Sequence, residues 1–167
     1  MRTGMLYQIR RGWLVVPLAL ILLAAVAWLW PSPNPDAQVA TAWGLPGVWQ
    51  QDCAAPLGAD NPQYKYSIEQ DKLLLRRDFG GGASDTSEMS NVATTPTGEI
   101  YYTVHFTQLG HDRRGRASRQ NMLTKSPDGR IRTIANKHAG SGEPSVIGGI
   151  RTEDGKPTPW MTRCRPE

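Results

Sequence analysis

The chain is poor in the residues from which redox and catalytic sites are built. Its 167 residues include only two cysteines, and Cys53 and Cys164 lie far apart rather than in a C-x-x-C motif, so a redox-active pair is not expected. There is no G-x-S-x-G motif, and the glycine-rich stretch 79–85 lacks the Lys-Ser/Thr pair of a phosphate-binding loop. We predict that the protein is not an enzyme and needs no cofactor.

The sequence has only three histidines, and their spacing does not indicate a metal site. A zinc site needs three or four converging ligands, whereas His105 lies in an expected strand and His111 and Asp112 lie in the loop after it. We therefore predict no bound metal. A hydrolase with His105 or His111 as its base is the least favoured of the alternatives.

Excess positive charge is also missing from the part of the chain that would contact nucleic acid. The formal net charge is +4, but Arg2, Arg10 and Arg11 precede a long apolar segment. Of the 19 basic residues this leaves 16 in the rest of the chain, against 15 acidic residues. A nucleic-acid-binding domain usually carries a dense basic face. No nucleic-acid partner is predicted.

The long apolar segment, residues 13–30, contains no charged side chain. At about 1.5 Å per residue it nearly spans the roughly 30 Å hydrocarbon core of a bilayer. Trp13 and Trp30 bracket it, and arginines precede it but do not follow it directly, as the positive-inside rule requires. We predict a transmembrane helix, or uncleaved signal anchor, over 13–30 after a cytoplasmic basic flank over 1–12. The alternative is a signal peptide cleaved near Ala27, which releases the rest into the periplasm.

These features predict a single-pass protein of a bacterial inner membrane, with a cytoplasmic N-terminus and a periplasmic C-terminal domain. Residues 31–43 begin with three prolines in five residues, which favours an extended tether. Residues 44–167 are then the exported domain. Cysteines usually pair in an oxidising compartment, so we predict a disulfide between Cys53 and Cys164 that joins the first strand to the last.

Short strands and turn sequences alternate through the exported domain. In residues 100–106, Ile100, Tyr102 and Val104 alternate with more polar neighbours, and turn sequences such as SPDG at 126–129 separate such runs. No stretch after residue 43 has a sustained helical period. We predict an all-β fold, a small antiparallel β-barrel or sandwich of seven to nine strands, preceded by the one transmembrane helix.

A G-x-W motif, Gly47-Val48-Trp49, opens the first expected strand. This motif, followed by an antiparallel meander, resembles the start of a lipocalin-type barrel. The resemblance implies that Trp49 closes one end of the barrel and packs near a basic residue of the last strand, Arg163 or Arg165. It also implies a disulfide from near the first strand to the C-terminus, and a cavity for a small molecule. The chain resembles small membrane-anchored exported proteins of bacteria as well.

Arginines are concentrated in one segment of the domain, where Arg113, Arg114, Arg116 and Arg119 lie within seven residues. Their strong local positive field suits an anionic lipid surface or an acidic envelope protein. The competing interpretation is a solvated loop that discourages edge-strand aggregation.

Taken together, the sequence predicts a membrane-anchored periplasmic interaction module, or an accessory subunit of an envelope complex. The alternative of a different class is a lipocalin-like barrel that binds a small molecule in an internal pocket open at one end. The sequence makes no prediction of oligomeric state.

Overall fold

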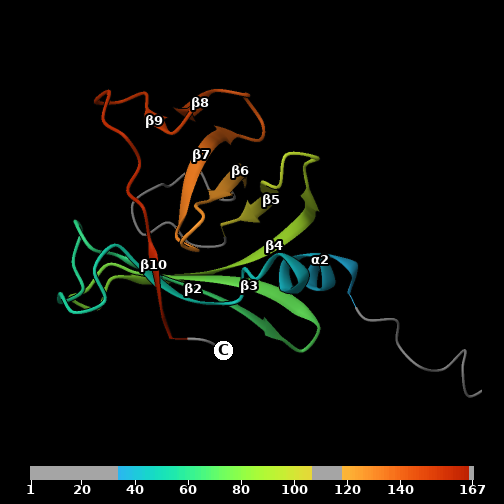
Figure 1. Cartoon of the computed structure of the whole chain (residues 1–167), viewed down its shortest axis with the longest axis horizontal. Coiled ribbons are helices and arrows are strands. Elements are labelled where there is room, and N and C mark those ends of the chain that lie inside the picture. The colour runs from blue at the N-terminus through green and yellow to red at the C-terminus, as the bar shows by residue number, and fades with distance from the viewer. Residues whose placement is uncertain (1–33, 107–117, 166–167) are drawn as a thin grey trace, which may run out of the picture. The chain divides into compact units, whose positions relative to one another are not determined.

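The strands of the domain pair mostly in the order in which the chain supplies them. The computed structural model describes residues 34–106 and 118–165. Its strands are β1 (Gly47–Gln50), β2 (Gln63–Glu69), β3 (Lys72–Asp78), β4 (Ser84–Thr94), β5 (Ile100–His105), β6 (Ser118–Lys125), β7 (Ile131–His138), β8 (Pro144–Ile147), β9 (Ile150–Arg151) and β10 (Thr162–Arg165). They form one antiparallel sheet of order β10-β1-β2-β3-β4-β5-β6-β7-β8-β9 (Figure 1).

The predicted antiparallel β-fold is confirmed, but the strand count of seven to nine is wrong. The segment SVIGGIRT contains parts of two short strands, β8 and β9, rather than one strand. Gly148 and Gly149 have φ values of 60° and 81°, so they turn the chain between Ile147 and Ile150, which pair. Two successive residues with positive φ form the tight turn that suits a twisted hairpin. The turn therefore divides this segment into β8 and β9 and brings the number of strands to ten.

The sheet is continuous, so it is not a sandwich of two sheets, and within the described residues it does not close into a full barrel. β9 pairs only with β8, and β10 pairs only with β1. The segment before β10 is nevertheless joined to β7, because Ile131 and Met161 exchange two backbone hydrogen bonds of 3.0 and 2.8 Å. The segment before β10 therefore lies against the first residue of β7, and the curved sheet has an interior.

A helix stands where the sequence predicted an extended tether. Helix α2 spans Pro35–Trp43, and the side chain of Asn34 accepts a hydrogen bond from the backbone N–H of Asp36 at its N-terminus. Pro35 occupies the first helical position, where proline loses no hydrogen bond and its φ already suits a helix. Gly44 ends the helix in the left-handed conformation. The tether prediction is thus wrong for residues 35–43, and residues 31–33 lie outside the described part.

Helix α2 belongs to the β-domain. It lies beside β3 and β4 and packs chiefly on β4, with Ala37 and Ala40 buried (Figure 1). Its last carbonyl groups accept hydrogen bonds from two cations, Lys125 and Arg163. Cations at a helix C-terminus are favourable because the helix dipole is negative there. The β-domain thus begins at Asn34 rather than at residue 44.

The predicted disulfide between Cys53 and Cys164 is present and connects the β1–β2 loop to β10. Its two cysteines are separated by 111 residues of chain. No free cysteine is found in the described residues. The disulfide therefore ties the β1–β2 loop to β10, the strand at one edge of the sheet.

The interior divides into an apolar half near α2 and a polar half at the opposite strand ends. The inward residues change from one half to the other along each strand: Leu73 to Arg77 in β3, Leu123 to Arg119 in β6, and Ile131 to Asn136 in β7. The apolar half is closely buried, with Leu73 and Ile131 fully inaccessible. Burial of these apolar side chains supplies the main stabilising free energy of the fold.

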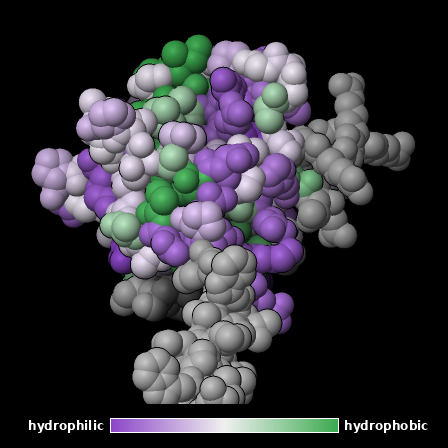
Figure 2. Space-filling model, turned by 90° about the vertical axis from the view of Figure 1, so that its right-hand side faces the viewer, coloured by the Kyte–Doolittle hydropathy of each residue, from purple (hydrophilic) through white to green (hydrophobic). Residues whose placement is uncertain are grey.

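The outer surface differs from this interior. Figure 2 shows the face on the right-hand side of Figure 1, where hydrophilic residues cover most of the area and hydrophobic residues form small separate patches. Scattered apolar residues of this kind are usual on a protein surface.

The predicted membrane segment, residues 13–30, lies outside the described residues. In the part of the chain that is described, α2 is too short to cross a bilayer, and no other helix qualifies.

Candidate functional site

The polar half of the interior encloses a cavity of about 1140 Å³. It opens among β2, β3, β5, β6 and β7, the β1–β2 loop and the segment 156–161 before β10. Its lining includes five cationic side chains, Arg77, Arg119, Arg132, Arg151 and Lys156, but only one carboxylate, Asp60. Aromatic residues make up much of the remainder. The cavity is therefore both cationic and aromatic.

Arg77 is already neutralised within the fold. Its guanidinium donates from Nε to Oδ1 of Asp85 at 2.9 Å and from a terminal nitrogen to the other carboxylate oxygen. The two side chains are only 18% and 12% exposed. The guanidinium also lies 4.3 Å from the ring centroid of Phe106. Such a paired and stacked arginine supports the cavity wall rather than offering a free charge.

Arg119 is held differently, by neutral groups. Its Nη1 donates to Oδ1 of Asn136 at 3.2 Å and to Oγ of Ser145 at 3.3 Å. Ser145 itself donates to the same Asn136 oxygen at 2.6 Å, and the Asn136 amide donates to Asn121. These residues come from β6, β7 and β8. The guanidinium thus has a fixed orientation and makes no ion pair with any residue of the described part.

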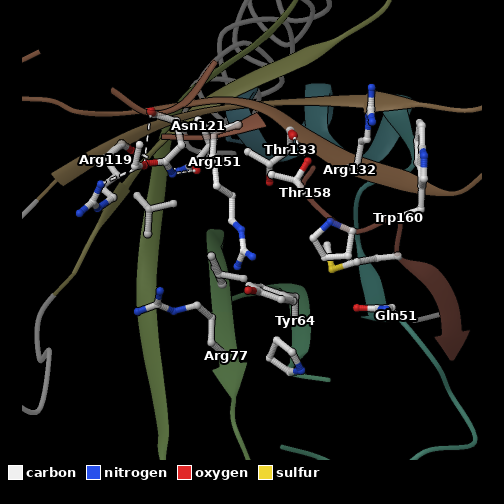
Figure 3. Close-up of a pocket in the computed structure, with 18 of the residues that line it drawn as sticks. Gln51, Tyr64, Arg77, Arg119, Asn121, Arg132, Thr133, Arg151, Thr158 and Trp160 are labelled. Atoms are coloured by element: carbon white, nitrogen blue, oxygen red, sulfur yellow. Dashed lines mark hydrogen bonds between the residues drawn. The ribbon is translucent and has the colours of Figure 1, made fainter. Parts of the chain in front are cut away.

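Figure 3 shows how the labelled cations lie around the hollow. Arg151 extends from β9 into the middle of the cavity, between Arg119 above and Arg77 and Tyr64 below. A terminal nitrogen of Arg151 donates to Asp154 at 2.5 Å, so its charge is partly compensated. Burial raises the pKa of Tyr64, and the Arg77 guanidinium acts in the opposite direction.

The side of the cavity nearest the apolar half is formed by two tyrosines. Tyr66 and Tyr102 are almost fully buried, their hydroxyl oxygens lie 3.0 Å apart, and their rings meet edge to face at 6.2 Å. Burial raises the pKa of both phenols well above the usual value of 10.0, so both stay neutral. Each hydroxyl has one proton to donate, and their mutual bond uses one of the two.

Arg132 and Trp160 stand at the end of the cavity away from Arg119 (Figure 3). The Arg132 guanidinium lies 4.7 Å from the centroid of the Trp160 indole, and its Nε is buried without a hydrogen-bond partner in the described structure. Gly149 permits this packing, because a Cβ there would come within 3.2 Å of the guanidinium carbon.

Of the four arginines that the sequence singled out, only Arg119 lies in the described residues, and it lines the cavity. Arg113, Arg114 and Arg116 lie in the segment 107–117, outside the described part. The sequence analysis missed Arg77 and Arg151. Their inward positions follow from strand alternation, but the alternation does not say which strands face one another across a hollow.

Trp49 and Arg163, the pair that the lipocalin resemblance implied, are in contact. The guanidinium of Arg163 lies 4.8 Å from the centroid of the Trp49 ring, and Trp49 donates from its indole nitrogen to the Leu45 carbonyl at 2.9 Å. Trp49 is 2% exposed. The contact lies at the α2 end of the interior, where Arg163 also donates to the Gly44 carbonyl, whereas the cavity occupies the other end.

His105 lies on the outer face of the sheet, away from the cavity. Its Nε2 is 2.7 Å from Oγ of Ser90, and its Nδ1 is 2.9 Å from Oγ of Ser118. Both partners are serine hydroxyls, and neither is the carboxylate that orients a catalytic imidazole and stabilises its protonated form. His111 and Asp112 lie outside the described residues. Within residues 34–106 and 118–165, no group of three His, Cys, Asp or Glu side chains converges as metal ligands.

By its fold and its cavity, the described part of the chain is an antiparallel β-domain whose curved sheet surrounds a cavity lined by cationic and aromatic side chains. Comparison of the chain with family models, curated proteins and solved structures gives no match.

Proposed function

We propose that the domain is a binding module that holds a small molecule in its interior cavity. The observation that carries this proposal is the hollow itself. Protein interiors are normally packed with side chains, whereas about 1140 Å³ is open here in the polar half. Ligand cavities in proteins commonly measure about 300–1,000 Å³ and combine apolar walls with a few fixed polar groups.

The choice of this function over an accessory subunit follows from where Arg119 lies. The interaction-module hypothesis assigned the arginine segment to a partner surface. Arg119, the one member among the described residues, instead turns into the cavity and is fixed there by Asn136 and Ser145. An interior arginine suits a ligand better than a flat partner surface.

We further propose that the module is exported and anchored by residues 13–30. The Cys53–Cys164 disulfide supports this location, since such bonds persist in oxidising compartments and are rare in the cytosol. The module then holds its ligand on the periplasmic side of the membrane, without catalysing a reaction.

Two substitutions on neighbouring residues of β8 test the cavity. Val146 lines the hollow, while the next residue, Ile147, does not and is 60% exposed. The probe is naphthalene-2-carboxamide, a flat neutral molecule, and its affinity for the full-length protein is measured by titration calorimetry with a detergent-only blank. We expect Val146→Trp to weaken binding and Ile147→Trp to leave it unchanged. Binding in this cavity would be refuted if neither variant lost affinity for the probe, or if the wild type did not bind it.

A further inference from the structure

We propose that the ligand is an organic anion, with a carboxylate or phosphate group held by Arg119 and a flat apolar body resting against Tyr66 and Tyr102. This inference rests on the proposed function and names the class of ligand. It depends on the charge balance of the cavity wall, on the geometry of Arg119, and on the register of β5 and β6.

The first step concerns charge. Two of the lining arginines have acidic partners, Arg77 with Asp85 and Arg151 with Asp154. Arg119 has none among the residues that the structure describes, although its side chain is half-buried. A charge withdrawn from water without a counter-charge is unfavourable. An anionic group on the ligand removes that cost, which a neutral group does not.

The second step concerns geometry. A guanidinium has five N–H donors in a planar fork. The bonds from Arg119 to Asn136 and Ser145 both use Nη1, so its Nε and Nη2 have no acceptor among the described residues. Nε and Nη2 form one edge of the fork, and this edge matches the two oxygens of a carboxylate or phosphate. Because Asn136 and Ser145 already fix the side chain, little rotamer freedom is lost on binding.

The third step locates the apolar body. In the β5–β6 register, Asn121 lies opposite Tyr102, and Arg119 lies opposite Val104, two residues further along. Two residues of strand measure about 7 Å. Measured along the strand, Arg119 thus lies about the length of a fused two-ring system from the position opposite Tyr102. The spare hydroxyl proton of the tyrosine pair is available to a second oxygen of the ligand.

A matched pair of probes separates charge from shape. Naphthalene-2-carboxylate and naphthalene-2-carboxamide share one ring system and differ in the charge of one substituent. We expect the full-length protein to bind the carboxylate at least about tenfold more tightly at pH 7, because a guanidinium bonds a charged carboxylate more strongly than a neutral amide. The affinities are measured by titration calorimetry in the same detergent.

Arg119→Gln is the decisive variant, and Arg76→Gln is its control. Glutamine keeps a polar side chain at this position but lacks the charge and the fork. Arg76 is exposed on β3 and does not line the cavity, so its replacement removes the same charge from the protein elsewhere. We expect Arg119→Gln to weaken binding of the carboxylate much more than binding of the carboxamide, so that the preference for the carboxylate disappears. Arg76→Gln should keep the full preference.

Asn136→Ala tests the positioning of Arg119 without removing its charge. We expect the ratio of the carboxylate affinity to the carboxamide affinity to fall part of the way toward one. A wild type that binds both probes equally, or an Arg119→Gln protein that keeps the preference, would overturn the anion inference and leave cavity binding intact. If neither probe binds the wild type, the proposed function itself fails.

Discussion

Breaking the disulfide between Cys53 and Cys164 should remove a large part of the stability of the domain. The bridge closes a loop with a sequence separation of 111 residues. The chain-entropy relation for a loop of this length gives about 4.8 kcal/mol of stabilisation at 25 °C. Folded domains are typically stable by about 5–15 kcal/mol, so the double variant Cys53→Ser/Cys164→Ser should lose between about a third and nearly all of its stability.

Urea unfolding of the double variant and the wild type, followed by circular dichroism, measures this loss. Reduced wild-type protein is the matched control, because it lacks the bond without any substitution. We expect both to lose several kcal/mol relative to the oxidised protein. The β1–β2 loop and the segment before β10 also line the cavity, so the carboxamide probe should bind more weakly. A loss below about 1 kcal/mol in both proteins would refute the entropic reasoning.

Three further predictions concern stability. Asn34→Ala removes the N-cap of α2 and should lower the free energy of unfolding by about 1 kcal/mol in urea titrations; an unchanged value would mean that the cap does not hold the helix. Arg77→Met leaves the Asp85 carboxylate unpaired and should lower the free energy of unfolding by about 3 kcal/mol. Adding Asp85→Leu should recover most of this loss, and no recovery would contradict the pairing. Because folding raises the pKa of Tyr66 and Tyr102, the unfolded chain loses these protons first, so the contribution of these two phenols to stability should be constant below about pH 10 and fall above it. Tyr66→Phe should reduce that fall, measured by alkaline urea unfolding.

The strands could be predicted from the sequence because their signal is local. Alternation in residues 100–106 matches β5, and the SPDG turn falls between β6 and β7 as expected. The disulfide followed from the number of cysteines. The split between β8 and β9 was missed, although the Gly148-Gly149 pair was visible as a turn signal.

Helix α2 was missed because three prolines were taken together as a sign of extended chain. The first two lie before the described residues, and the third, Pro35, starts the helix. The pattern of an N-cap Asn34, a proline at the first helical position and Gly44 after the last turn was present in the sequence. The cap signals were better evidence than proline content, because proline disrupts a helix in its interior and not at its first position.

The candidate site was only partly accessible from the sequence. Arg119 was identified, but as part of a surface loop. Its interior position depends on the pairing of β6 with β5 and β7 and on the curvature that brings Met161 to Ile131. These are contacts between distant parts of the chain, and no local pattern encodes them. The empty space between Arg119 and the tyrosine pair is likewise a property of the folded sheet.

A crystal structure of the full-length protein with naphthalene-2-carboxylate is the most direct test of cavity binding. We expect the ring system against Tyr66 and Tyr102, and the carboxylate within hydrogen-bonding distance of Nε and Nη2 of Arg119. The main competing position is the groove on the outer face of β5 to β8, where Tyr101 and Ile147 are exposed. A probe found there, with the interior unoccupied, would contradict both the ligand class and the site.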